Sequence, residues 1–122
     1  MKNQAYRMTM LFDFYGELLT DRQKEFFDLY YNEDLSLAEI AENYGISRQG
    51  VRDVIVRAEG IMTEVEDKTG IIKRFHQMQK ALAEASENLD KIISINGNKY
   101  FDFELDNLAH KVKDTVEQLK QE

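Results

Sequence analysis

The feature that most constrains the fold is a pair of helix-start signals separated by one glycine, within LSLAEIAENYGISRQGVRDVIVRAEG, residues 35–60. Ser36 and Glu39 match a capping box, in which the side chain of each residue accepts a hydrogen bond from the backbone amide of the other. Ser47 supplies a second N-cap, and Gly45 lies between them, where a left-handed residue ends a helix. The pattern predicts two short consecutive helices joined by a tight turn.

The same stretch has the residue types that a helix-turn-helix requires. Two helices that cross at about 90–120° need a small residue where they approach and a turn residue that accepts a positive φ. Ala41 and Gly45 occupy these two positions. Apolar residues that would hold the crossing angle are Ile40, Ile46, Val51 and Val54. We therefore predict a helix-turn-helix.

Two further helices are predicted before this motif. Residues 7–19 place apolar side chains at helical i, i+3 and i+4 spacing. Thr20 and Gln23 form another capping box, which predicts a helix running to about Tyr31. After Gly60 the sequence becomes acidic, and we place a boundary there, with a helix-turn-helix module over residues 1–68 and a second part over residues 69–122.

The second part is predicted to be a pair of helices joined at the turn Asn96 to Asn98. Its apolar residues recur with alternating steps of four and three, which is a heptad pattern. They are Ile71, Phe75, Met78, Leu82, Ala85, Leu89 and Ile92, followed by Phe101, Leu105, Leu108, Val112 and Leu119. One interpretation is a helical hairpin that packs on itself or on the first module. The other is an intermolecular coiled coil that makes a homodimer through the C-terminal helices.

Composition narrows the class of protein. The 122 residues include no proline and 6 glycines, which favours an all-α fold. The chain has no cysteine, and His76 and His110 have no second metal ligand nearby in the sequence, so we expect no metal site. No phosphate loop, nucleophile motif or cofactor motif is present, so we expect neither an enzyme nor a cofactor. Without a signal-peptide pattern or a span of roughly 20 apolar residues, a cytoplasmic protein with no membrane insertion is expected.

The exposed face of the second helix of the motif indicates a candidate binding surface. At 100° per residue, Val51, Val54, Ile55 and Ala58 face inward, whereas Gln49, Arg52, Asp53 and Val56 face outward with Arg48 at the edge. No acidic residue lies three or four positions from Arg48 or Arg52, so both suit phosphate or guanine contacts. The predicted nucleic-acid-binding residues are Ser47, Arg48, Gln49, Arg52 and Arg57.

Other observations favour a protein-directed surface. The chain has a net charge of −7, which opposes non-specific binding to nucleic acid. Asp53 repels phosphates, and Asp53 and Val56 are therefore candidate interface residues for a protein partner. Asp53 also lies four residues before Arg57, which predicts a surface ion pair between them. The remaining alternative is that the arginines are simply solvated or pair with carboxylates elsewhere.

The quoted residues resemble two known groups of proteins. Residues 19–58 look like region 4 of sigma-70-type factors, and RMTMLFDFYGELLTDRQKEFFDLYYNEDLSLAEIAENYGISRQGV, residues 7–51, is similar to the bacterial YlxM family. The resemblance implies an all-α, sigma-70 region 4-like helix-turn-helix module followed by a C-terminal helical hairpin. It also implies a regulatory part in the signal recognition particle pathway.

The resemblance also implies possible partners for this chain. DNA is favoured over RNA, because the deep, narrow major groove of RNA does not accept a helix. A dimer would read half-sites about 34 Å apart. A component of the signal recognition particle, or its RNA, is the alternative partner. Residues 59–67 depart from the sigma pattern with four acids and no base, so the phosphate clamp of a sigma factor is missing.

Overall fold

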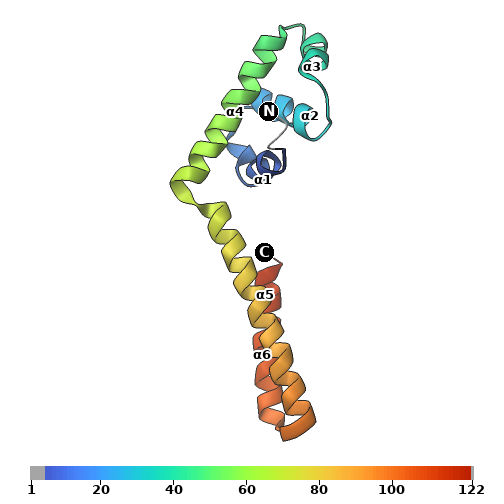
Figure 1. The fold of residues 1–122 in the computed structure, drawn as a ribbon, viewed down its shortest axis with the longest axis vertical. Helices are drawn as coiled ribbons and strands as arrows, with labels where there is room; N and C mark the ends of the chain where they lie inside the picture. Colours follow the sequence, from blue (N-terminus) through green and yellow to red (C-terminus); the bar gives the residue numbers. More distant parts are fainter. Residues whose placement is uncertain (1–4, 122) are drawn as a thin grey trace. The chain divides into compact units, whose positions relative to one another are not determined.

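The computed structural model describes residues 5–121, and all of their regular secondary structure is helical, as Figure 1 shows. The elements are α1 (Ala5–Tyr15), a 3-10 turn η2 (Gly16–Leu18), α2 (Asp21–Tyr31), α3 (Leu37–Tyr44), α4 (Arg48–Thr69), α5 (Ile71–Ile95), a π-helical turn η3 (Asn96–Tyr100) and α6 (Phe103–Lys120). The prediction of an all-α fold is confirmed. The chain divides into two compact units between Ile72 and Lys73. None of the described helices is long and apolar enough to cross a membrane.

The first helix is shorter than the predicted range 7–19. It ends at Tyr15 and is followed by the 3-10 turn, in which Leu18 is 60% exposed. Leu19 and Thr20 are extended, with ψ of 155° and 162°, because Thr20 must leave helical geometry to cap α2. The helical spacing correctly predicted that Met8, Leu11 and Tyr15 are buried, but extending it to residue 19 conflicted with the cap at Thr20, and Leu18 is exposed.

Both predicted capping boxes are confirmed. The Thr20 hydroxyl accepts from the Gln23 amide at 3.2 Å, and the Thr20 amide donates to Gln23 Oε1 at 2.9 Å. Ser36 and Glu39 make the equivalent pair of bonds at 3.1 and 3.0 Å. Each box satisfies amide donors that have no partner within the helix, which stabilises a helix start by about 1 kcal/mol.

The first unit has two apolar clusters, and α2 contributes to both. Phe26 and Phe27 are adjacent and fully buried, but they enter different clusters. Phe27 packs with residues of α1 and of the second half of α4, and its ring is stacked on Phe12 with centroids 4.7 Å apart. Phe26 packs with Ile40 of α3 and with the first half of α4. Helix α4 is thereby held along most of its length.

A carboxylate organises the end of α4. The helix continues through the acidic stretch to Thr69 and ends at Gly70, which has a φ of +61°. Glu66 Oε1 accepts a hydrogen bond from the Tyr15 hydroxyl at 2.6 Å and from the Ile72 amide at 3.0 Å. Burial and this hydrogen bond to a carboxylate raise the pKa of Tyr15. Glu66 thus joins α1, the end of α4 and the first turn of α5.

The second unit is an antiparallel helical hairpin of α5 and α6 (Figure 1). The Ser86 hydroxyl of α5 donates to Glu117 of α6, which lowers the pKa of Glu117, and Lys113 pairs with Asp90. At the turn, Asn96 is only 3% exposed. Its side chain donates to the Asp102 carbonyl at 2.7 Å and accepts from the Asp102 amide at 3.0 Å. A buried polar residue therefore fixes the connection.

The contact between α5 and α6 does not follow the predicted heptad stripes. Met78 is 61% exposed and Ile92 is 42% exposed, although both belong to the stripe predicted on α5. On α6 the buried residues are Ala109 and Val116, which lie beside the predicted stripe. The apolar pattern is present, but α5 and α6 meet along one edge of it.

Candidate nucleic-acid interface

Helices α3 and α4 form the predicted motif with the expected turn. Gly45 ends α3 with a φ of 66° and a ψ of 33°, the left-handed conformation that glycine adopts without steric cost. The Ser47 hydroxyl then accepts from the Gly50 amide at 2.9 Å and starts α4. Ile40 and Val51 are fully buried and Ala41 is 5% exposed, so the contact between the helices is closely packed. The motif is in place, with α4 as its second helix.

Gly50 has a packing reason for its position near the start of α4. A Cβ atom there would lie 3.2 Å from the Ser47 hydroxyl oxygen and 3.7 Å from Ile46 Cδ1. The first distance is shorter than ordinary van der Waals contact, so a larger residue would require the capping hydroxyl to shift by a few tenths of an ångström. Glycine thus sacrifices intrinsic helix propensity but keeps the cap that starts the helix.

The predicted inward and outward faces of α4 agree with the observed burial, apart from one residue. Val51, Ile55 and Ala58 are fully buried, whereas Val54 is only half-buried. The seven predicted binding or interface residues are all exposed: Ser47, Arg48, Gln49, Arg52, Asp53, Val56 and Arg57. All seven are therefore accessible along the first three turns of α4, and at 100° per residue Arg48 and Arg57 lie on opposite sides of the helix. Within residues 5–121, neither Arg48 nor Arg52 forms an ion pair.

The predicted ion pair between Asp53 and Arg57 is wrong. Asp53 Oδ1 instead accepts a hydrogen bond from Gln49 Nε2 at 2.8 Å, and no described carboxylate pairs with Arg57. Both partners of Asp53 are possible by helical spacing, since Gln49 and Arg57 each lie four residues away. The observed choice directs the Gln49 amide toward Asp53 and leaves the Arg57 guanidinium without an ion pair among the described residues.

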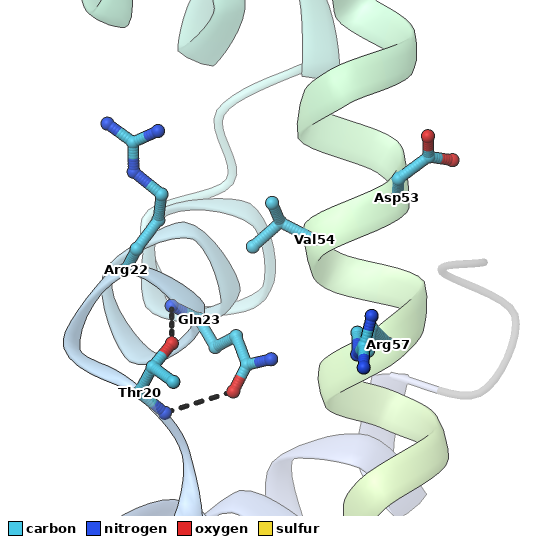
Figure 2. Close-up of a pocket in the computed structure, with 6 residues that line it drawn as sticks. All are labelled: Thr20, Arg22, Gln23, Asp53, Val54 and Arg57. Carbon is cyan, nitrogen blue, oxygen red and sulfur yellow. Dashed lines mark hydrogen bonds between the residues drawn. The ribbon is translucent and has the colours of Figure 1, made fainter.

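A shallow depression beside this face contains an arginine that the sequence pattern did not indicate. It has a volume of about 300 Å³ and is lined by Thr20, Arg22, Gln23, Asp53, Val54 and Arg57. Figure 2 shows Arg22 on α2 and Arg57 on α4 at opposite margins, with the half-buried Val54 between them. The Arg22 guanidinium lies 5.4 Å from the centre of the Phe26 ring, which holds it by a cation–π contact. Only the tertiary packing of α2 on α4 brings Arg22 into this surface.

The sequence matches, over residues 2–99, the family described as helix-turn-helix proteins that are YlxM / p13 like. The chain belongs to this family. The match covers the first unit from residue 2 onward and all of α5, and it ends inside the turn Asn96–Tyr100. The YlxM resemblance noted from the sequence is therefore confirmed, and the all-helical fold agrees with the helix-turn-helix description of the family.

Curated relatives in the same family are similar over most of their length. A UPF0122 protein of Desulforamulus reducens is 48% identical over 87 residues, which are 71% of this chain and 74% of that protein. The UPF0122 protein lwe1821 of Listeria welshimeri is 42% identical over 120 residues, which are 98% of this chain and 97% of that protein. The YlxM-like similarity to the Listeria protein thus includes α6 as well as the helix-turn-helix.

Proposed function

We propose that this YlxM-family chain is a cytoplasmic regulatory protein that binds DNA by inserting the start of α4 into the major groove. The observation that supports this proposal is a series of exposed arginines along the start of α4, Arg48, Arg52 and Arg57, with Arg22 sharing the depression with Arg57, in a chain whose net charge is −7. Among residues 5–121 none of these four arginines forms an ion pair. An acidic protein that keeps its arginines together and away from carboxylates has a surface suited to a polyanion.

The arrangement supports separate roles for these side chains. The major groove is about 12 Å wide and admits one α-helix, so the exposed residues of the first turns of α4 would reach base edges. Arg52 lies at the centre of this face and suits a guanine or a central phosphate. Arg22 and Arg57, at the two margins of the depression, suit phosphates of the backbone. Ser47 and Arg48 lie at the helix start, where the N-terminal end of the helix dipole favours negative charge.

The same surface predicts modest affinity for a single copy. Asp53 stands on the reading face, and the residues after Arg57 contribute acids where a sigma factor contributes bases. Each phosphate contact releases counterions and adds to the salt dependence of binding, so a small number of arginines gives a shallow slope. Binding by one copy is thus local and weak, and sequence readout must come from few contacts.

The direct test is Arg52→Glu, measured by fluorescence anisotropy with duplex DNA selected by the wild-type protein from a random pool. We expect affinity to fall at least tenfold, because a central contact is worth about 1–3 kcal/mol and the substitution adds repulsion. The slope of log affinity against log salt should become shallower by about 1.

Arg7→Glu is the matched control, because it makes the same charge change at an exposed position on α1, outside the proposed surface. Equal loss of affinity in Arg7→Glu and Arg52→Glu would show that only net charge matters and would reject the assigned surface. Failure to select any duplex, or a salt response that is flat for the wild type, would reject DNA binding itself.

A second function is supported by two features of the same face. The hydrogen bond between Gln49 and Asp53 occupies the amide that an adenine contact would use, and Val56 is 39% exposed beside it. These suit a protein partner, and the YlxM resemblance suggests a component of the signal recognition particle. This function predicts that the component co-purifies with the chain after nuclease treatment, and that Val56→Lys abolishes its retention. Retention that is lost on nuclease treatment would favour nucleic-acid binding instead.

A further inference from the structure

The hairpin exposes apolar side chains that are regularly spaced along both helices. Met78, Ile92 and Ile95 on α5 are 61%, 42% and 53% exposed. On α6, Leu105, Leu108, Val112 and Leu119 are 43–52% exposed. Their steps of three, four, seven and fourteen are those of a heptad seam, which in water is stable only when another helix covers it.

The contact line between α5 and α6 is more polar than these exposed stripes. Ser86 is 6% exposed and donates to Glu117, and the other buried residues of this line are Asn96, Ala109 and Val116. Lys113 of α6 pairs with Asp90 of α5 across the same line. The larger aliphatic residues of α6 have thus been left outside the hairpin's own contact.

The exposed stripes of the two helices lie on the same face of the hairpin. At 100° per residue, the stripe of each helix is displaced by about a quarter turn from the side that contacts the other helix. When each helix is viewed from its own N-terminus, the stripe is rotated away from the contact in the same direction in α5 and in α6. Because the two helices are antiparallel, rotation in the same direction places both stripes on the same side of the hairpin. The hairpin therefore has one continuous apolar face.

This placement is the geometry of half a four-helix bundle. In a two-helix coiled coil, each apolar stripe points directly at the other helix, whereas in a four-helix bundle it points between two neighbours. On α5, Leu82 and Leu89 are half-buried toward α6, while Met78 and Ile92 on the adjacent flank of the stripe are open. Within the hairpin each helix therefore packs against one other helix, whereas in a four-helix bundle each helix packs against two.

We propose that a second copy of this hairpin covers the apolar face, so that the chain is a homodimer held by a four-helix bundle of α5 and α6 from each copy. The seven exposed side chains amount to roughly 600 Å² per copy, or about 1,200 Å² in total, which meets the lower bound for specific interfaces. In a two-fold symmetric dimer the apolar face of each copy packs against that of the other, so one interface covers both apolar faces.

Charge at the margins of the face agrees with self-association. Charged residues lie on the side of each stripe that is farther from the contact between α5 and α6. On α5 they are Glu84 and, one heptad later, Lys91, and on α6 they are Glu104 and, one heptad later, Lys111. Each helix thus has an acid before a base on this side. If the same helix of a second copy runs antiparallel to it, the acid of one copy lies opposite the base of the other. This order of charges therefore suits pairing with a second copy.

The test is the mass of the full chain by sedimentation equilibrium, for the wild type and for Leu108→Lys/Val112→Lys. We expect the wild type at about 100 μM to have twice the chain mass of 14.3 kDa. The double variant should have the mass of one chain, with dimer affinity reduced at least 100-fold. Ala83→Lys/Asn107→Lys adds the same charge at exposed positions of α5 and α6 on the side of the hairpin opposite the stripes, and should remain dimeric.

Far-UV circular dichroism checks that the variants stay folded. Both substituted side chains are already half exposed in one copy, so helical signal should persist in the monomeric variant. If the double variant loses helix, Met78→Lys on α5 decides, because that residue is 61% exposed and makes a single change. A wild type that is monomeric at this concentration would overturn the proposal, because its apolar face would then have to be covered by something other than a second copy. A dimer that persists in every variant of the stripe would overturn it as well.

Discussion

Three tyrosine hydroxyls donate to carboxylates on other helices, and this follows from the excess of acids. The chain has 23 Asp and Glu but 16 Lys and Arg, so many carboxylates have no basic partner. Tyr15 donates to Glu66, Tyr31 to Glu59 and Tyr44 to Glu25. Burial and the hydrogen bond to Glu59 raise the pKa of Tyr31, and burial and the bond to Glu66 raise that of Tyr15. A hydroxyl supplies a donor without adding charge inside the unit.

These contacts predict a loss of stability at alkaline pH. In the unfolded chain tyrosine ionises near pH 10, whereas in the folded chain Tyr15 and Tyr31 stay protonated above it. A raised pKa contributes stability that is complete below about pH 10 and is lost as pH rises further. We expect the urea midpoint of the wild type to fall between pH 8 and about 10.5. Tyr15→Phe/Tyr31→Phe should be less stable at pH 8 but fall less over this interval.

The control for the alkaline loss is Tyr6→Phe. Tyr6 is 79% exposed, so its replacement should leave both the midpoint at pH 8 and its fall toward high pH close to those of the wild type. An equal fall in all three proteins would mean that the Tyr15 and Tyr31 hydroxyls do not couple folding to pH.

At the scale of the elements, the helix caps and turns could be predicted from the sequence, but the direction in which each helix points its apolar face could not. The capping boxes at Thr20 and Ser36 and the left-handed Gly45 were predicted because cap and turn chemistry acts within four residues. The apolar stripes of the hairpin were also predicted, but their direction depends on which helices surround them. The sequence equally allowed Asp53 to pair with Gln49 or Arg57, and nothing local placed Arg22 beside α4.

The same substitution, glycine to alanine, should have opposite effects on stability at two positions of α4. One position lies in the second half of the helix and the other at its end. Gly60 lies inside the helix, and a Cβ atom there would meet open space, so Gly60→Ala should stabilise by about 0.5–1 kcal/mol. Gly70 also has open space but a φ of +61°, so Gly70→Ala should destabilise by about 1–2 kcal/mol. Thermal unfolding of both variants checks this. Equal shifts of the same sign would show that the left-handed end of α4 is not maintained.

At the scale of the whole molecule, the net charge of −7 and the two proposed surfaces depend on one another. One copy offers few arginines for DNA, and the rest of the chain repels phosphates over a Debye length of about 8 Å. Two linked copies double the contacts, and linkage can raise the overall affinity by about 10²–10⁴ without any new contact. Dimerisation through the hairpin would thus compensate for the weak affinity of a single α4.

This dependence gives a prediction for the monomeric variant Leu108→Lys/Val112→Lys, whose substitutions lie outside the first unit. On the selected duplex, its affinity should fall at least tenfold, and its slope of log affinity against log salt should be about half that of the wild type, because half the phosphate contacts remain. Ala83→Lys/Asn107→Lys carries the same added charge on the opposite side of the hairpin and should match the wild type. If the monomeric variant keeps the wild-type slope, one copy makes all the contacts, and the dimer serves another purpose than gripping DNA.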